Sequence, residues 1–313
     1  MERSIHTCYR RDRLNRTIVP EGCDMRERTV TVIGLGPMGQ AMANAFLDRG
    51  YRVTVWNRTA SRADALVARG AALAVSAEAA VAANELVVLS LTDYQAMYEI
   101  LEPAVAALAG RVLVNLSSDT PERARDAARW AADHGAQHLT GGVQAAPPGI
   151  GQPGSFTFYS GPKDVFEAHQ EALEVLTATD YRGEDPGLAA LFYQLQMDVF
   201  WTTVLSWLHA VAVADAHGIA ADEILPYAAN LLKGLPDFLA FTAPRLVAGE
   251  HPGDVDRLSM GLASVEHVVR TTTDAGVDAA LPTALLEIFR RGVAAGRAGD
   301  SATSLVEVLK AAR

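Results

Sequence analysis

The run Thr29-Val-Thr-Val-Ile-Gly34-Leu35-Gly36-Pro37-Met38-Gly39 decides the fold of this chain. A short β-rich segment is followed at once by three glycines in the spacing Gly-x-Gly-x-x-Gly, and a helix is expected from there to Asp48. Between a strand and a helix, such glycines let the backbone turn tightly and approach a pyrophosphate, while amides at the helix N-terminus point toward it. The segment therefore predicts the first strand, turn and helix of a dinucleotide-binding domain.

From Thr29 to about Asp180, short β-rich runs alternate with alanine-rich runs. This alternation predicts an α/β domain with a doubly wound, mostly parallel sheet of the Rossmann type and helices on both faces. Strands are expected at Val30–Ile33, Arg52–Trp56, Glu85–Ser90, Arg111–Leu116, Gln137–Leu139 and Ser155–Tyr159. Gly50, Gly70 and Gly135 stand just past expected helices, where glycine permits a left-handed cap. The glycine- and proline-rich segment from Gly141 to Gly154 is expected to be a functional loop.

A long helix is predicted after Asp185-Pro186, because an acidic N-cap followed by proline is a typical helix start. Almost every residue from there to Gly218 tolerates a helix, which would be about 48 Å long at roughly 1.5 Å per residue. Its apolar residues cover every face, and Asp198 is the only charged residue between Pro186 and Ala214. A helix that is apolar all round must be buried all round. Because the shorter helices expected after it cannot cover it alone, we expect a homodimer with interlocked C-terminal helices.

A membrane span is the alternative for this helix, but polar residues interrupt it: Gln194, Gln196, Asp198, Thr202, Thr203, Ser206 and His209. The formal net charge of -10 and the pI near 5.3 oppose a nucleic acid or an anionic membrane as a partner, since both normally need a clustered positive field. The first residues lack the pattern of a secretory signal, so we expect a cytoplasmic protein. The two cysteines, Cys8 and Cys23, precede the first predicted strand, so no disulfide is expected in the folded body.

Three parts are expected along the chain. Residues 1–28 hold seven arginines and five acidic residues without clear periodicity, which indicates a flexible N-terminal extension, such as a start upstream of Met25 would add. Residues 29–186 form the Rossmann domain. Residues 187–313 begin with the long interdomain helix and form an all-α domain for dimerisation and substrate binding.

The end of the second predicted strand, Val55-Trp56-Asn57-Arg58-Thr59, indicates which dinucleotide binds. An NAD-dependent protein normally places a carboxylate here for the ribose hydroxyls, whereas Asn57 is neutral and Arg58 is cationic. A phosphate on that ribose would be repelled by a carboxylate but bound by guanidinium and hydroxyl donors, so NADPH is expected in preference to NADH. The alternative is that Arg58 is a solvated residue at the start of a helix.

Ligands of such sheets lie beyond the carboxyl ends of the strands, so later strand ends are also expected to contact the cofactor. The cofactor-binding residues predicted from the fingerprint and the strand ends are Gly34, Leu35, Gly36, Pro37, Met38, Gly39, Asn57, Arg58, Thr59, Ser61, Ser90, Leu91, Thr92, Asn115 and Ser117, with Arg62 as a further donor. Each hydroxyl at these strand ends could equally cap the helix that follows it, and for Thr92 and Asp119 capping is the better interpretation.

Several segments together resemble the β-hydroxyacid dehydrogenase superfamily over nearly the whole chain: the glycine fingerprint, Asn57-Arg58-Thr59, Asn115-Leu-Ser-Ser-Asp-Thr-Pro121, Thr140-Gly-Gly-Val143 and the long helix. Within it, the chain is most similar to NADPH-dependent imine reductases of the tyrosine type, and the deciding segment is Asp185-Pro-Gly-Leu-Ala-Ala-Leu-Phe-Tyr193. The dehydrogenases carry a catalytic lysine six residues after the glycine that corresponds to Gly187, where this chain has Tyr193. Its only lysines, Lys163, Lys233 and Lys310, lie outside this helix.

The resemblance implies that hydride passes from nicotinamide C4 of NADPH to the carbon of a small cyclic imine, with Tyr193 catalytic and a chiral amine, mainly S, as product. The departure from lysine is chemically consistent, because reducing a carbonyl generates an alkoxide that needs a strong proton donor, whereas reducing an iminium yields a neutral amine directly. Tyr193 could donate a proton to the imine nitrogen or only orient the iminium and a water, and the sequence leaves both open. On its own residue type, Tyr193 would be a core aromatic.

The same resemblance implies that Gly142 and Val143, together with Gly141, pass near the nicotinamide, where missing side chains allow close approach. In the related dehydrogenases a serine before this Gly-Gly pair helps to hold a substrate carboxylate. This chain has Thr140 there, which neither confirms nor excludes an acid substrate.

The substrate pocket is expected to be apolar. Met197, Phe200 and Trp201 follow Tyr193 by four to eight residues and share its helix, with plain core packing as the alternative. Met260, in Met260-Gly-Leu-Ala263, resembles the stretch that closes the pocket from the partner subunit. His267, as a lone histidine, is interpreted as structural.

The sequence contains no motif of another class of enzyme site. The histidines show no metal-ligand spacing, so no metal is expected, and there is no Gly-x-Ser-x-Gly nucleophile motif. Two alternatives to an imine reductase stay open: a β-hydroxyacid or carbonyl dehydrogenase that uses NADP(H), and an NADP-binding regulator without turnover. An assay with a cyclic imine beside a hydroxyacid distinguishes them.

Overall fold

The computed structural model describes residues 28–311, so the two cysteines and nearly all of the predicted N-terminal extension lie outside the described residues. The chain divides into two compact units whose boundary falls between Gln196 and Met197. This boundary lies inside helix α7 (Gly187–Ala216), so the helix begins in the first unit and ends in the second.

The first unit contains an eight-stranded sheet in the order β3-β2-β1-β4-β5-β6-β7-β8. Its strands are β1 (Thr29–Ile33), β2 (Arg52–Trp56), β3 (Ala72–Leu73), β4 (Leu86–Leu89), β5 (Val112–Asn115), β6 (Gln137–Gln144), β7 (Phe156–Ser160) and β8 (Ala178–Gly183). All neighbouring strands are parallel except β6 and β7. The chain moves outward from β1 to β3 and then returns to place β4 on the other side of β1. The predicted doubly wound sheet is confirmed, and ligands of such sheets bind where the strand order reverses.

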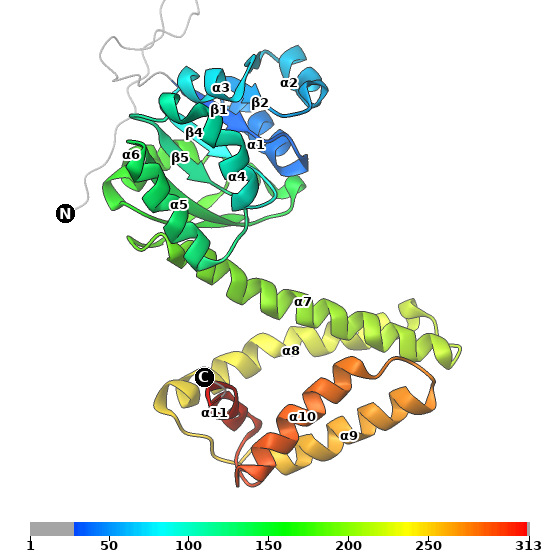
Figure 1. Ribbon diagram of the computed structural model, residues 1–313. Helices are drawn as coiled ribbons and strands as arrows, with labels where there is room; N and C mark the ends of the chain where they lie inside the picture. The colour runs from blue at the N-terminus through cyan, green and yellow to red at the C-terminus, as the bar shows by residue number, and fades with distance from the viewer. Residues whose placement is uncertain (1–27, 312–313) are drawn as a thin grey trace, which may run out of the picture. The chain divides into compact units, whose positions relative to one another are not determined.

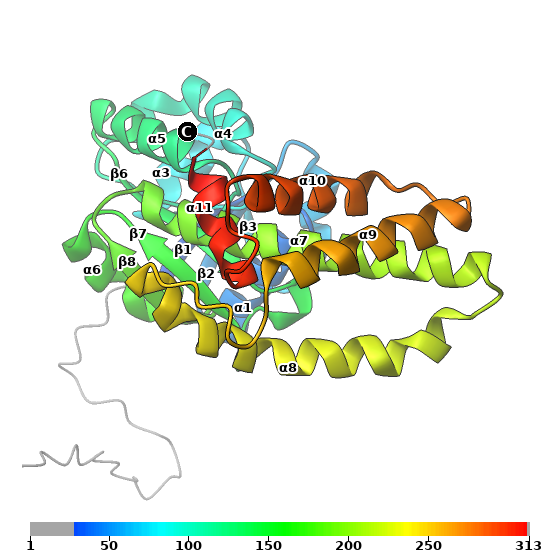
Figure 2. The same ribbon diagram turned by 90° about the horizontal axis from the view of Figure 1, so that it is seen from below.

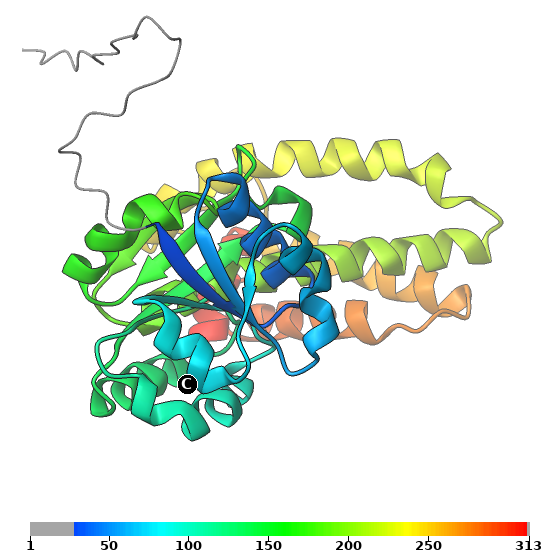
Figure 3. The same ribbon diagram turned by 90° about the horizontal axis from the view of Figure 1, so that it is seen from above.

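Helices cover both faces of this sheet (Figures 1 and 3). They are α1 (Pro37–Asp48), η1 (Ala60–Ala63), α2 (Asp64–Ala68), α3 (Ala77–Ala83), α4 (Tyr94–Leu101), η2 (Glu102–Ala107), α5 (Pro121–Asp133), η3 (Pro147–Gly149) and α6 (Lys163–Leu173). Because side chains alternate along a strand, Val30 and Val32 pack in one core with α1 and α6, while Ile33 packs in a second core with α3, α4 and α5. The predicted glycine caps are confirmed by positive φ angles of 77° at Gly50, 101° at Gly70 and 72° at Gly135.

Three local predictions were wrong. Gly141–Gln144 is not part of a loop, because β6 continues to Gln144 and pairs with β7, and this pairing overrides the low strand propensity of the two glycines. Strands β3 and β8 were missed, since β3 has only two residues and the edge strand β8 is too polar to show apolar alternation. The side-chain caps of α4 and α5 are Asp93 and Thr120, each one residue later than predicted.

The second unit is helical, as expected. After α7 it contains α8 (Ala221–Ala248), α9 (Leu258–Asp274), α10 (Ala280–Ala294), η4 (Ala302–Ser304) and α11 (Leu305–Lys310). Helices α9 and α10 lie side by side (Figures 1 and 2), and a Cβ added to Gly261 of α9 would lie 2.5 Å from the ring of Phe289 on α10. Helix α8 has 28 residues against 30 in α7, although it contains Pro226, Pro236 and Pro244.

Helix α7 is long and apolar enough to cross a membrane by length and composition alone, and none of its most apolar window is buried within this chain. Its exposed apolar side chains are Leu191, Leu195, Val199, Phe200, Trp201, Leu205 and Leu208. The predicted pattern of apolar residues on every face is therefore confirmed, while the described residues of one chain leave much of this surface open.

His138 generates a testable prediction about stability. It lies on β6 with both ring nitrogens buried and without a hydrogen-bond partner in the described part of the chain, and burial lowers its pKa to about 4. The unfolded chain binds this proton near pH 6.5 and the folded chain only near pH 4, so folding stability falls as the pH drops through this window. The full loss is on the order of 3 kcal/mol.

Urea denaturation of wild type and of His138→Leu between pH 7.5 and 4 measures this contribution. Other groups also titrate in this range, so the quantity of interest is the difference between the two proteins. We expect the free energy of unfolding to fall more steeply for wild type. Parallel pH profiles would contradict the prediction.

Candidate active site

Two cavities open at the carboxyl edge of the sheet in the first unit. The first, of about 520 Å³, lies between the glycine turn after β1 and the end of β2. The second, of about 310 Å³, lies beyond the ends of β5 and β6 and is bounded by the start of α7. Both are lined by Met38, Ser90, Leu91 and Thr92, so they form one groove across the switch point of the sheet. Its position is where a dinucleotide binds in this type of sheet.

The three fingerprint glycines meet different surroundings. A Cβ on Gly34, whose φ is +93°, would lie 2.2 Å from the carbonyl oxygen of Ser90, and one on Gly39 would lie 1.8 Å from the carbonyl oxygen of Gly34. These two glycines are therefore required by the packing of the turn. A Cβ on Gly36 would meet nothing within 4 Å, so Gly36 alone faces open space. This open backbone is what a bound pyrophosphate would need.

The N-terminus of α1 is suited to an anion. Gly36 occupies the N-cap position, and no side chain in the described residues caps the helix there. The first amides of a helix lack partners within the helix, and their partial positive charge favours a phosphate group. Pro37 at the first helical position has no amide to satisfy.

Asn57 supports the glycine turn at the end of β2. Its Oδ1 accepts a hydrogen bond from the backbone N–H of Leu35 at 2.9 Å, and its Nδ2 donates to the carbonyl of Thr59 at 3.0 Å. A neutral amide can both accept and donate here, whereas a carboxylate can only accept. Asn57, whose neutral side chain indicated NADPH in the sequence, thus also holds the glycine turn after β1 in place.

Cationic side chains gather at this end of the groove. Arg58, Thr59 and Arg62 line the first cavity, whereas Ser61 lines neither cavity. The side chain of Arg58 is 71% exposed and forms an ion pair with Glu99 at 3.3 Å. Exposed pairs of this kind contribute little to stability, so the guanidinium can turn to a phosphate at small cost.

The ends of β4 and β5 form the middle of the groove. Ser117 Oγ accepts from the backbone N–H of Leu91 at 3.1 Å, and Asn115 Oδ1 accepts from the backbone N–H of Ser117 at 3.0 Å. Ser117 lines the second cavity, whereas Asn115 is fully buried and lines neither. Asn115 therefore supports the site from beneath. Leu35 and Gly39 are likewise near the groove without lining it.

Tyr193 and Gly142 form the wall of the second cavity. A Cβ on Gly142 would lie 2.8 Å from the Cβ of Tyr193 and 2.9 Å from the carbonyl oxygen of Ala189, so only glycine lets β6 approach α7 this closely. Thr140 and Val143 also line this cavity, and the side chain of Thr140 is buried. The structure thus brings the half-buried Tyr193 to the same groove as the glycine turn.

The start of α7 is fixed by a charged pair. Arg125 of α5 donates two hydrogen bonds to the Asp185 carboxylate, at 2.8 and 2.7 Å, and Asp185 accepts from the backbone N–H of Gly187 at 2.9 Å. The guanidinium holds the pKa of Asp185 below its usual range, and the Gly187 amide acts in the same direction. The predicted acidic start of the helix is confirmed by this capping bond.

The predicted substrate residues Met197, Phe200, Trp201 and Met260 all belong to the second unit. The side chains of Phe200, Trp201 and Met260 are exposed. Their role in a substrate pocket stays a prediction.

Further residues line the groove. Leu116, Ser118 and Asp119 belong to the strand end that was expected to contact the cofactor, and Trp56 and Thr140 belong to segments already considered. The residues that were not predicted are Ala96, Ile100, Ala145, Pro147 and Ala190. Ala190 lies one helical turn before Tyr193, so helical spacing could have indicated it. Ala145 and Pro147 follow the true end of β6, which the sequence placed too early.

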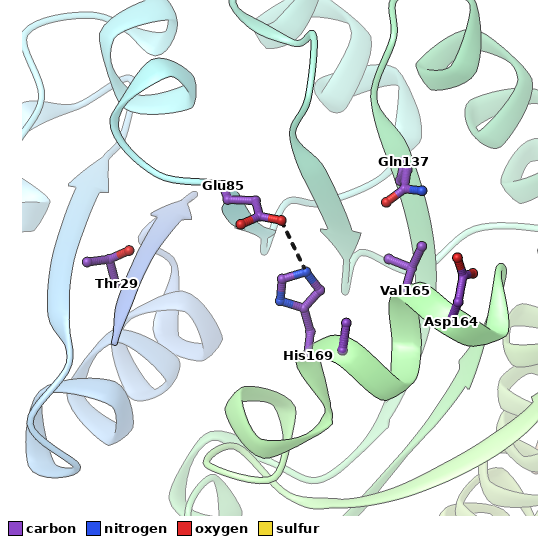
Figure 4. Close-up of a pocket in the computed structure, with 7 residues that line it drawn as sticks. Thr29, Glu85, Gln137, Asp164, Val165 and His169 are labelled. Carbon is purple, nitrogen blue, oxygen red and sulfur yellow. Dashed lines mark ion pairs between the residues drawn. The ribbon is translucent and has the colours of Figure 1, made fainter. Parts of the chain in front are cut away.

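Another hollow, of about 500 Å³, lies at the opposite, amino edge of the sheet (Figure 4). Thr29 and Gln137 line it from the first residues of β1 and β6, and His169 of α6 pairs with Glu85 at 3.9 Å. None of the predicted site residues lines this hollow. In the part of the chain that the structure describes, no cluster of three His, Cys, Asp or Glu residues could hold a metal ion.

Comparisons with known proteins agree with this geometry. Residues 29–183 match the family model of the NAD binding domain of 6-phosphogluconate dehydrogenase, and residues 185–311 match the NADPH-dependent reductive aminase-like C-terminal domain. The NADPH-dependent reductive aminase of Aspergillus oryzae is 30% identical over 285 residues, which cover 90% of this chain and 97% of that protein.

Solved structures extend the similarity. The imine reductase BcSIRED from Bacillus cereus BAG3X2 is 65% identical with a TM-score of 0.82, and the match covers 90% of this chain and 99% of that one. A reductive aminase from Aspergillus terreus in complex with NADPH and ethyl levulinate is 34% identical with a TM-score of 0.87, at the same coverage. Since both halves of the chain and nearly all of these relatives are matched, the chain belongs to the family of imine reductases and reductive aminases.

Proposed function

We propose that this protein is an NADPH-dependent imine reductase that converts small cyclic imines into chiral amines. The observation that carries the proposal is the position of Tyr193, an uncharged phenol packed against Gly142 at one end of a groove whose other end holds Arg58 and Arg62. NADPH, when bound, supplies a hydride to the imine carbon, and the nitrogen takes or already carries a proton, so that amine and NADP⁺ are the products.

The residues of the first cavity bind and orient the cofactor. The open backbone at Gly36 and the amides of α1 would hold the pyrophosphate, while Arg58, Thr59 and Arg62 would hold the phosphate on the ribose. Ser90, Leu91 and Thr92 connect the two cavities, so a dinucleotide bound in this way extends toward Thr140, Gly142 and Tyr193.

Tyr193 acts on the substrate nitrogen, either as proton donor or by orienting the iminium. A lysine ammonium at this position would repel a cationic iminium, whereas a phenol does not. The described lysines, Lys163, Lys233 and Lys310, belong to α6, α8 and α11, so none of them stands on α7, where Tyr193 lies. The missing ammonium is also the argument against a hydroxyacid or carbonyl dehydrogenase, since an alkoxide product needs a stronger proton donor.

We further propose that the enzyme is a homodimer in which the C-terminal helices interlock. Besides α7, helix α8 exposes a second set of large apolar side chains: Leu225, Tyr227, Leu231, Leu232, Leu235, Phe238, Leu239 and Phe241. An apolar groove of about 450 Å³ lies between the end of α7, the start of α8 and Thr271 of α9. Contiguous apolar surface of this extent indicates a protein interface, and a second copy offers complementary apolar faces.

Replacing Tyr193 tests the catalytic proposal. Tyr193→Phe is expected to lower kcat for 2-methyl-1-pyrroline by about 10²-fold or more if the phenol donates the proton, and by less if it only orients the substrate. NADPH oxidation followed at 340 nm measures kcat, cofactor fluorescence measures NADPH binding, and chiral chromatography of the amine tests the expected S product.

The control in this assay is NADPH affinity, which is expected to be unchanged. Full activity of Tyr193→Phe would contradict a catalytic role. No NADPH oxidation by wild type with any of a panel of cyclic imines, despite tight NADPH binding, would favour a regulator without turnover. Faster turnover of a hydroxyacid than of imines would favour a dehydrogenase.

Arg58 is expected to select the phosphorylated cofactor. A hydrogen bond to a charged group contributes about 1.5–3 kcal/mol, so Arg58→Ala should raise the KM for NADPH roughly tenfold or more and leave the KM for NADH almost unchanged. Arg129→Ala, which removes an exposed arginine on α5, is the matched control. An equal effect of Arg58→Ala on both cofactors would show that this residue does not contact the ribose phosphate.

The dimer is tested by placing a charge on its proposed interface. Leu231 is 76% exposed in the single chain, so Leu231→Asp should fold normally but shift the mass measured by light scattering from about twice 33.3 kDa toward a single chain. Val75→Asp makes the same chemical change at a 95% exposed position of the first unit and should remain dimeric. A wild-type protein that is monomeric at micromolar concentration would refute the dimer.

A further inference from the structure

We infer that Ser160 is a positioning residue for Tyr193: its hydroxyl fastens the first turn of α7 to the sheet and so sets where the phenol lies. This inference rests on the proposed function, because it assigns Ser160 a role through Tyr193. Ser160 is the last residue of β7 and lines neither cavity.

The Ser160 hydroxyl bonds to two backbone groups at the start of α7. Its Oγ donates to the carbonyl oxygen of Pro186 at 2.9 Å and accepts from the backbone N–H of Ala189 at 2.9 Å. Ser160 is completely buried. The N–H of Ala189 is among the first amides of the helix, which have no partner within the helix. Ser160 therefore caps α7 from strand β7, while Asp185 caps the amide of Gly187 from the segment just before the helix.

Three contacts join the face of the sheet to the first two turns of α7. Gly142 of β6 touches Tyr193, and the ring of Phe158 on β7 lies 5.4 Å from that of Phe192. Ser160 is two residues after Phe158 and so points to the same face. Of these three contacts with the sheet, the one at Ser160 is made by hydrogen bonds, which fix direction as well as distance.

The position of Tyr193 follows that of the first turn. Tyr193 lies four residues after Ala189, about one turn along a rigid helix. A shift of the helix start is therefore passed on to the phenol, and a displacement of about 1 Å in a catalytic group can cost on the order of 10²-fold in rate. The Arg125–Asp185 pair would still hold the N-terminal end of α7. Loss of the serine hydroxyl should therefore loosen the contact between α7 and the sheet without breaking it.

Ser160 is also continuous with other buried polar groups of the sheet. It pairs with Thr140 on β6, and Thr140 pairs with Asn115 on β5. Asn115 holds the backbone of Ser117 at the middle of the groove, and Ser160 holds the backbone of α7 at its end. The two outer members of this row thus fix the two walls of the second cavity.

A double-mutant cycle tests the inference. Wild type, Ser160→Ala, Tyr193→Phe and the double variant are compared in kcat with 2-methyl-1-pyrroline and in NADPH affinity. We expect Ser160→Ala to lower kcat about 10- to 100-fold with NADPH affinity within about twofold of wild type, since the residues of the first cavity are on other strands. In the Tyr193→Phe background the same change should have little further effect, because the group it positions is already gone.

Two controls separate positioning from a general loss of stability. Ser304→Ala removes another completely buried serine, in the second unit, and should leave kcat unchanged. If Ser160→Ala does not fold, Ser160→Cys keeps the volume but is a weak donor and gives the same comparison.

The outcomes are distinct. Equal losses from Ser160→Ala in both backgrounds, or full activity of the single variant, would overturn the role of Ser160 while leaving the proposed function intact. Full activity of Tyr193→Phe would instead refute the catalytic role of Tyr193 and the inference with it.

Discussion

The close approach of strand β6 to helix α7 is the constraint on which the rest of this site depends. Gly142 has no Cβ, and adding one would bring it within 3 Å of both the Tyr193 Cβ and the Ala189 carbonyl. Any other residue would push the helix, and the phenol with it, away from the carboxyl edge of the sheet. A second glycine, Gly187, allows the helix start to lie against Arg125, whose Cζ would be 2.8 Å from an added Cβ. The absence of a Cβ at Gly142 and at Gly187 thus determines the position of the Tyr193 side chain.

The charge distribution of the groove follows the chemistry that we propose for it. Arginines and helix amides gather at the end where phosphates would bind, whereas the described residues that line the other end include no cation: they include Tyr193, Thr140 and Gly142, with the carboxylate of Asp119 beside them. Phosphates need fixed positive groups because they are anionic at every working pH. A protonated imine needs the opposite: a polar surface without a fixed positive group that would repel it.

Helix α7 belongs to both units, and this links the site to the proposed dimer. Its first turns are held by Asp185, Arg125 and the sheet, while its later turns expose apolar side chains that the described part of one chain does not cover. Helix α8 presents a comparable surface despite its internal prolines. If a second copy covers both, the helix that presents Tyr193 is also the one that the partner stabilises, so assembly and catalysis would depend on each other.

The sequence by itself determined the parts of this protein that are encoded in short spacings. The glycine turn, the strand ends, the long apolar helix and its acidic start are local patterns. Tyr193 was indicated by the family resemblance, which implies a catalytic residue six positions after Gly187. Only the tertiary structure decided that β6 continues through its glycines, that β8 completes the sheet, that Asn115 lies beneath the groove, and that Ser160 caps a helix 27 residues further along the chain. These features arise from pairing between distant segments, and no local spacing encodes which buried polar group will find its partner across a sheet.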